Sequence, residues 1–236
     1  MGGMNPNITS LVAAIAGGML PALAWLWFWR REDSKHPEPR RLIALAFLAG
    51  MCTVGLVVPL EQLVEVYIHN QTLLFTAWSA IEETLKLLVA AAVILWNKEN
   101  DEPLDAVIYM VALALGFSAA ENTLFILSPL AGSTLPQIVT TDDFRFIGAT
   151  LVHILGSGTI GVALALAFYS KSFMRKVWFA FVGLILAIFL HSTFNFLILN
   201  TPQAYILRVF TLVWVGIIAL LATLEYVKRM TPRKGR

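Results

Sequence analysis

The chain has 236 residues, of which 58% are hydrophobic and only 14% are charged, and its mean hydropathy is +0.75. This composition is too apolar for a soluble domain and predicts a protein that crosses a membrane several times. The formal net charge of +2 does not indicate a nucleic-acid partner, because the basic residues lie in short clusters between apolar segments, where they orient a membrane protein. The single cysteine, Cys52, excludes an internal disulfide and a cysteine-rich metal site. Any metal would therefore need Glu and His ligands.

Seven apolar windows of about 20 residues follow one another along the chain, and each predicts a transmembrane helix. The windows run from Ile8 to Trp29, Leu42 to Leu60, Leu73 to Trp96, Leu104 to Leu127, Phe146 to Tyr169, Val177 to Leu199 and Ala204 to Val227. No hydrophilic segment between them is long enough for a soluble domain. The expected fold is an all-α, polytopic transmembrane bundle in the cell membrane, forming a single domain over residues 1–236.

The basic residues predict the orientation of this bundle. If the seven helices alternate in direction, the Lys and Arg residues of the first, third and fifth connections and of the C-terminal tail all fall on one side of the membrane. The opposite side has only Arg145, with Arg208 inside the last window. Because cytoplasmic loops carry the excess of Lys and Arg, we expect the N-terminus outside and the C-terminus in the cytoplasm.

Three charged residues, Glu82, Glu83 and Lys86, interrupt the third apolar window. A charge at membrane depth costs at least about 2.5 kcal/mol, so these side chains need partners, water or a metal. On a helix, Lys86 can reach either glutamate, whereas the two glutamates point about 100° apart. We therefore expect only one glutamate to face a site. The polar stripe that Glu82 shares with Ser79 and Lys86 favours Glu82.

Titratable residues of four expected helices lie at a similar depth. At about 1.5 Å per residue, Glu82, Glu121, His153 and His191 lie roughly 9 to 14 Å from the same face of the membrane. Asn195 follows His191 by one helical turn and could donate a hydrogen bond to an oxyanion. A single buried His or Asn often only joins two helices. Several titratable groups at one level are a costly way to join helices, so we expect one shared site.

These residues form an ordered series: Glu82-Glu83-x-x-Lys86, Asp105 with Tyr109, Phe117-x-x-x-Glu121-Asn122, His153, and His191-x-x-x-Asn195. The series resembles the motifs of the PrsW family of intramembrane proteases and, more distantly, those of the CAAX prenyl endopeptidases. The second motif ends in a glutamate, as in PrsW-like proteins, which argues against prenylated substrates. The resemblance spans roughly residues 73–199, the expected catalytic core. It leaves the first, second and seventh helices as scaffold.

The resemblance implies an endopeptidase that cleaves a membrane-anchored protein of the anti-sigma-factor type near its extracytoplasmic face. Carboxylate and imidazole groups in a dry site can supply a base and stabilise an oxyanion, either alone or through a metal. We expect Glu82 to activate the water, with Glu83 and Asn195 in supporting catalytic roles. Zn²⁺ is the expected metal, with one position open for water. The expected ligands are Glu121, His153 and His191.

Two other functions fit the same residues. Glu82, Glu121 and the two histidines could form the relay of a proton- or ion-coupled transporter. A relay usually needs polar groups throughout the membrane thickness, and the inner half of the windows has few. A non-catalytic membrane chaperone would retain the bundle without chemistry, but both glutamates are present. The connection from Ser128 to Arg145 either gates the site or is inert.

Overall fold

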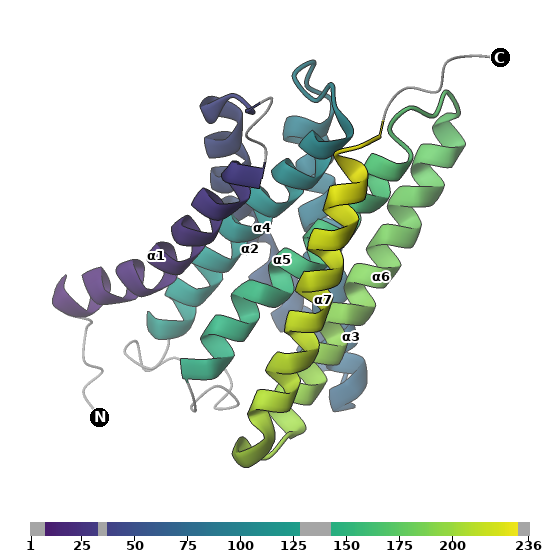
Figure 1. Cartoon of the computed structure of the whole chain (residues 1–236). Coiled ribbons are helices and arrows are strands. Elements are labelled where there is room, and N and C mark those ends of the chain that lie inside the picture. The colour runs from purple at the N-terminus through teal and green to yellow at the C-terminus, as the bar shows by residue number, and fades with distance from the viewer. Residues whose placement is uncertain (1–7, 33–36, 128–142, 231–236) are drawn as a thin grey trace, which may run out of the picture.

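The computed structural model describes residues 8–32, 37–127 and 143–230, and every regular element in these ranges is helical (Figure 1). The α-helices are α1 (Ile8–Glu32), α2 (Arg40–Tyr67), α3 (Gln71–Ala90), α4 (Pro103–Leu127), α5 (Asp143–Leu166), α6 (Phe173–Asn200) and α7 (Ile206–Val227). A π-helical turn, η1 (Ala91–Leu95), extends α3, and a 3-10 turn, η4 (Gln203–Tyr205), precedes α7. The predicted all-α bundle is confirmed.

Six of these helices, α1, α2, α4, α5, α6 and α7, are long and apolar enough to cross a membrane. Helix α3 is apolar at both ends but carries Glu82, Glu83 and Lys86 in its middle. All three charged side chains are buried inside the bundle and do not face its surface. The chain is therefore a multi-pass membrane protein in which α3 brings charge into the interior.

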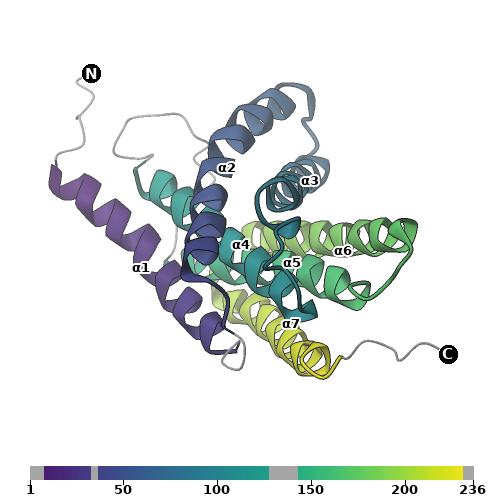
Figure 2. The same ribbon diagram turned by 90° about the horizontal axis from the view of Figure 1, so that it is seen from above.

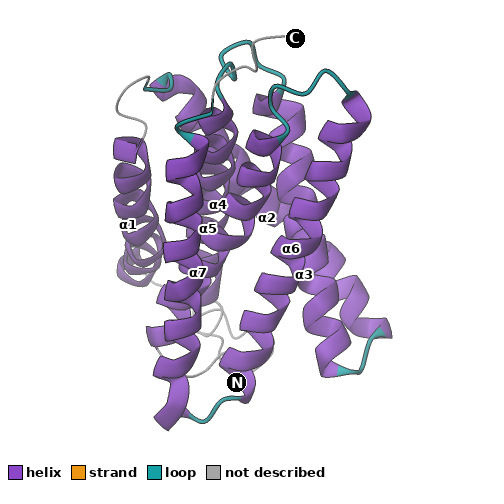
Figure 3. Cartoon of the chain, turned by 45° about the vertical axis from the view of Figure 1, so that its right-hand side comes forward, coloured by secondary structure: helices purple, strands orange, loops and turns teal. Residues whose placement is uncertain are grey.

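Helix α4 is the central helix of the bundle. Its residues from Pro103 to Ala119 are all buried, and it is apolar on every side, as expected for an enclosed helix. Helices α1, α2 and α5 pack against it most extensively, as the view from above shows (Figure 2). Helix α3 packs between α2 and α6 (Figure 2), and α7 lies over α5 (Figure 3). Five helices, α2 to α6, can therefore contribute side chains to one interior site.

Glycines allow α2 and α4 to approach each other closely. A Cβ at Gly50 of α2 would overlap the carbonyl oxygen of Leu113, and a Cβ at Gly116 of α4 would overlap the carbonyl oxygen of Phe47. Both obstacles are backbone atoms, which cannot rotate away. Small residues at such crossings let helix backbones pack directly in membranes.

We therefore expect Gly116→Ala to separate α2 from α4 and to lower the thermal stability of the protein in detergent. Overpacking of a helix crossing typically costs about 1 to 3 kcal/mol. Gly55→Ala is the matched control, because a Cβ at Gly55 of α2 would meet nothing within 4 Å. Equal midpoints of thermal unfolding for the two variants would contradict this account of the crossing.

Helix α2 is longer than predicted. The apolar window ended at Leu60, before the first charged residue of the segment, but the helix continues to Tyr67. The predicted end was wrong because the hydropathy average falls at the charged residue Glu61. The helix itself continues past this residue, because its side chain lies among other polar groups. Glu61 consequently belongs to the bundle, and its carboxyl faces the interior site described below.

The orientation of the bundle remains a prediction with a direct test. With Cys52 replaced, single cysteines at Ser34 and Ser133, which lie outside the described residues, should react with an impermeant reagent from opposite sides of the membrane. The expected result is labelling from outside at position 133 only, because the excess of Lys and Arg predicts that the basic connections face the cytoplasm. Labelling of both positions from outside would overturn the predicted topology.

Candidate active site

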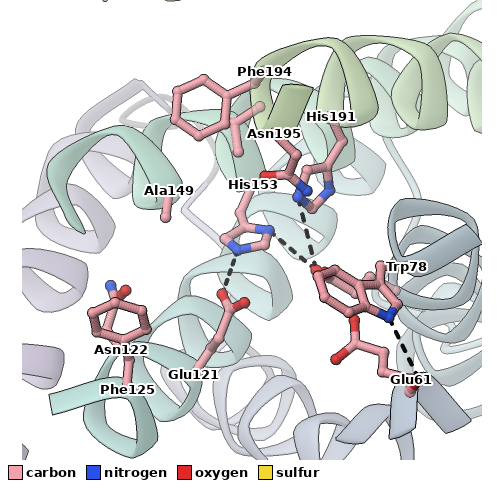
Figure 4. Close-up of a pocket in the computed structure, with 12 residues that line it drawn as sticks. Glu61, Trp78, Glu121, Asn122, Phe125, Ala149, His153, His191, Phe194 and Asn195 are labelled. Carbon is pink, nitrogen blue, oxygen red and sulfur yellow. Dashed lines mark hydrogen bonds and ion pairs between the residues drawn. The ribbon is translucent and has the colours of Figure 1, made fainter. Parts of the chain in front are cut away.

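A pocket of about 130 Å³ lies among five helices toward the end of the bundle where α2 joins α3 (Figure 4). This volume accommodates several water molecules. Its lining combines titratable, amide and aromatic side chains. The lining residues are Glu61, Trp78, Glu82, Glu121, Asn122, Phe125, Ala149, Val152, His153, His191, Phe194 and Asn195. The structure thus brings Glu82, Glu121, His153 and His191 together, as their common depth predicted.

The two adjacent glutamates of α3 are both buried but occupy different places. Glu82 lines the pocket and is 4% exposed, whereas Glu83 lies behind it and is 0% exposed. Glu83 accepts a hydrogen bond from Ser157 Oγ of α5 at 3.1 Å and lies 3.0 Å from His191 Nδ1 of α6. Only Glu82 lines the pocket, as expected, and Glu83 is held behind it by its contacts with Ser157 and His191. Helices α5 and α6 both pack near α3, so side chains about 100° apart on α3 each find polar partners.

Lys86 occupies the centre of the polar group. Its Nζ atom donates to Glu83 Oε1 at 2.9 Å and to Glu82 Oε2 at 3.2 Å, and it lies 2.8 Å from His153 Nδ1. The ammonium also lies 4.0 Å from the ring centroid of Phe117, a favourable cation–π position. A fully buried ammonium needs such partners, and Lys86 offsets one of the two negative charges of Glu82 and Glu83.

The two histidines come from different helices and meet at right angles. The ring centroids of His153 and His191 are 4.9 Å apart with an interplanar angle of 89°. His153 Nε2 lies 2.7 Å from Glu121 Oε2, so α4 orients the imidazole of α5. His191 Nε2 lies 4.0 Å from Glu82 Oε2, while its Nδ1 is held by Glu83. Each imidazole therefore has one ring nitrogen fixed by a carboxylate.

Four residues offer a compact set of metal ligands. One donor atom from each of Glu82, Glu83, His153 and His191 lies within 4.8 Å of the other three. Imidazole nitrogens and carboxylate oxygens are ordinary zinc ligands, so the chemistry of the set fits such an ion. This set differs from the ligands predicted from the sequence, which were Glu121, His153 and His191. In the structure, Glu82 and Glu83 lie with the two histidines, whereas Glu121 contacts the other ring nitrogen of His153, Nε2. The Lys86 ammonium lies among three of the four donors, so it and a metal compete for the same place.

Two further predicted residues, Glu121 and Asn195, lie at the pocket wall. The Glu121 side chain is 39% exposed, which makes it more accessible than Glu82. Asn195 lines the same pocket, one turn after His191, and its Nδ2 lies 3.4 Å from Ser79 Oγ. This weak bond leaves the amide able to donate to a ligand in the pocket.

A second polar group fixes α4 against α5 beside the pocket. Asn122 Nδ2 donates to Ser118 Oγ at 3.2 Å and to Thr150 Oγ1 at 3.1 Å, and the two hydroxyls are 2.9 Å apart. All three residues are buried. Because buried polar groups that satisfy one another hold helices at a fixed register, this group positions Glu121 relative to His153.

Sequence reasoning missed two residues of the pocket wall, Glu61 of α2 and Trp78 of α3. Trp78 Nε1 lies 3.4 Å from the carbonyl oxygen of Glu61 and joins the two helices. Glu61 was overlooked because it falls just beyond the end of an apolar window. The available signal was an acidic residue immediately after that window, at the same end of the bundle as the predicted site. The expected gate from Ser128 to Arg145 falls mainly outside the described residues.

Comparison with known proteins decides the family. The model of the PrsW family of intramembrane metalloproteases matches residues 38–223, which is most of the chain and includes every residue of the pocket. The chain belongs to the PrsW family. The chain is therefore a multi-pass intramembrane protease by family.

Several PrsW relatives match over most of their length. Protease PrsW of Clostridioides difficile (strain 630) is 25% identical over 187 residues, covering 77% of each protein. Protease PrsW of Geobacillus kaustophilus (strain HTA426) is 23% identical over 192 residues, covering 80% of this chain and 81% of the relative. Protease PrsW of Bacillus subtilis (strain 168) is 23% identical over 212 residues, covering 86% and 92%. No solved structure matches the chain.

Proposed function

We propose that this PrsW-family protein hydrolyses a peptide bond of a single-pass, membrane-anchored protein near the extracytoplasmic face, with water activated by Glu82. The observation that carries the proposal is the position of Glu82, a buried carboxylate on the pocket wall beside both histidines. By family resemblance, an anti-sigma-factor type of protein is the proposed substrate.

In the proposed reaction, Glu82 takes a proton from water as the oxygen attacks the carbonyl carbon of the substrate. The C–O bond forms, and the carbonyl oxygen becomes an oxyanion that accepts a hydrogen bond from Asn195 Nδ2. The C–N bond then breaks, and Glu82 returns the proton to the leaving amine. The hydroxyl group of the water ends on the new carboxyl terminus and its proton on the new amino terminus, and Glu82 returns to its ionised form.

The proposed metal would be held by His153 and His191 together with a carboxylate of Glu83 or Glu121. Zinc bound there would polarise the carbonyl of the substrate and activate water. The two carboxylates are distinguishable by metal analysis of purified Glu83→Gln and Glu121→Gln proteins. We expect the variant that lacks the true ligand to lose metal content, and the other to retain it.

The arrangement of polar groups favours hydrolysis over a transport relay. Tyr109 donates a hydrogen bond to Glu38 near the far end of α4. Between Tyr109 and Ser118, all residues of α4 are apolar and buried. Along this central helix, a full two turns therefore separate the pocket from the polar group at the other end, whereas a relay needs continuous polar groups.

The decisive experiment is cleavage in proteoliposomes. Purified wild-type protein is reconstituted with a single-pass anti-sigma-type test protein, and the products are identified by mass spectrometry, with metal content measured on the same sample. We expect one cleavage near the extracytoplasmic end of the substrate helix, sensitive to a chelator. Proton or ion flux without cleavage would favour the transporter instead.

A further inference from the structure

An acidic residue of α2, Glu61, lies in the pocket although no sequence motif marks it. It is less than two helical turns from the end of α2, and it lines the pocket together with Glu82 and Glu121. The bond from Trp78 Nε1 to its backbone carbonyl fixes this part of α2 against α3. Figure 4 shows the Glu61 carboxyl directed into the space bounded by Glu121 and His153.

Glu61 differs from the other acids of the site in its partners. Glu82 and Glu83 share the Lys86 ammonium at 3.2 and 2.9 Å, and Glu121 lies 2.7 Å from a ring nitrogen of His153. Within residues 8–32, 37–127 and 143–230, no Lys, Arg or His forms an ion pair with Glu61, whose carboxyl is instead hydrogen-bonded to that of Glu82.

The charged groups that face Glu61 are themselves acidic. They are Glu82 of α3 and Glu121 of α4, while Lys86 lies behind Glu82 and is already engaged by two carboxylates. Carboxyl groups this close at membrane depth need either a proton shared between them or a cation that contacts them. A positive group from outside the chain can therefore take the place of the proton between Glu61 and Glu82.

We propose that Glu61 selects the substrate by binding a Lys or Arg side chain next to the cleaved bond. This inference rests on the proposed proteolytic function and names a chemical feature of its substrate. A carboxylate forms a charge-assisted hydrogen bond with an ammonium or guanidinium group. Across the pocket from Glu61 lie Phe125 and Phe194, against which the aliphatic stem of such a side chain can pack (Figure 4).

The test uses full-length protein in proteoliposomes and a panel of single-pass test proteins. Each panel member has the same transmembrane helix, and one juxtamembrane position at a time is changed to Lys, Arg, Met or Glu. Cleavage sites and kcat/KM are measured for each member by mass spectrometry. Met matches the length of the Lys stem without its charge, and Glu reverses the charge.

The wild-type protein should cleave the Lys and Arg members about 10- to 100-fold more efficiently than the Met member at one position near the cleaved bond, which is the range for a hydrogen bond to a charged group. Glu61→Gln should remove this preference, mainly by raising KM for the Lys and Arg members. Glu61→Lys should reverse the preference in favour of the Glu member. Glu65→Gln is the matched control. This substitution removes the same charge one turn later in α2, at a residue that does not line the pocket.

Two results would overturn the proposal and leave the protease intact. The first is a wild-type protein that cleaves Lys, Met and Glu members equally well at every position. The second is a Glu61→Gln protein whose kcat falls by the same factor for all members, which would show that Glu61 acts only through Glu82. If wild-type protein cleaved no member of the panel, the proposed function would itself be refuted, and the selection proposal with it.

Discussion

Replacing Glu82 by Gln is expected to abolish detectable cleavage while the bundle stays folded. Loss of a general base typically lowers the rate by 10²- to 10⁴-fold. The amide has the volume of the carboxylate but cannot take the proton of water. Glu82 Oε2 lies 3.7 Å from His153 Nδ1 and 4.0 Å from His191 Nε2, so a water in the pocket can contact all three side chains. Proteoliposome cleavage and thermal unfolding of the same preparation check both parts of this expectation.

Glu83→Gln is the matched comparison, since it makes the same chemical change at the neighbouring position. Glu83 does not line the pocket, and its carboxylate is engaged by Lys86, Ser157 and His191. We expect its replacement to reduce cleavage less than Glu82→Gln does, and to lower thermal stability more. Near wild-type cleavage by Glu82→Gln would show that Glu82 is not the base, and a relay or structural role would then explain it better.

Much of the architecture follows from physical rules that act along single helices. Hydropathy windows locate the helices because a membrane span needs about 20 apolar residues. The convergence of Glu82, Glu121, His153 and His191 is predictable because rise per residue converts sequence position into depth. Neither argument needs knowledge of which helices are neighbours.

The remaining features of the site depend on helix packing, which one sequence does not reveal. Glu83 belongs to the polar group because α5 and α6 both supply partners for it, Ser157 and His191. Polar side chains on two faces of α3 are therefore buried. Glu61 belongs to the pocket because α2 continues past its apolar window. Helical spacing placed Lys86 within reach of either glutamate, but its contact with His153 links residues 67 positions apart and could not be predicted in this way.

A second large effect is expected at Lys86. In the presence of a chelator, Lys86→Met should unfold at a markedly lower temperature than wild type, because Glu82 and Glu83 would lose the ammonium that both carboxylates contact. Removing one partner of a buried ion pair typically costs about 3 to 5 kcal/mol. Lys98→Met is the control, since Lys98 lies in the exposed connection between η1 and α4.

The same variant should respond more strongly to a metal than wild type does. The Lys86 ammonium lies within 3.2 Å of donor atoms of Glu82, Glu83 and His153, which are three of the four residues in the compact donor set. Without it, Zn²⁺ meets no competing cation there, and binding to the folded state raises its stability. We expect added Zn²⁺ to raise the unfolding temperature of Lys86→Met by more than that of wild type, with a matching rise in bound metal. Equal responses of the two proteins would show that a metal and the ammonium do not occupy the same place.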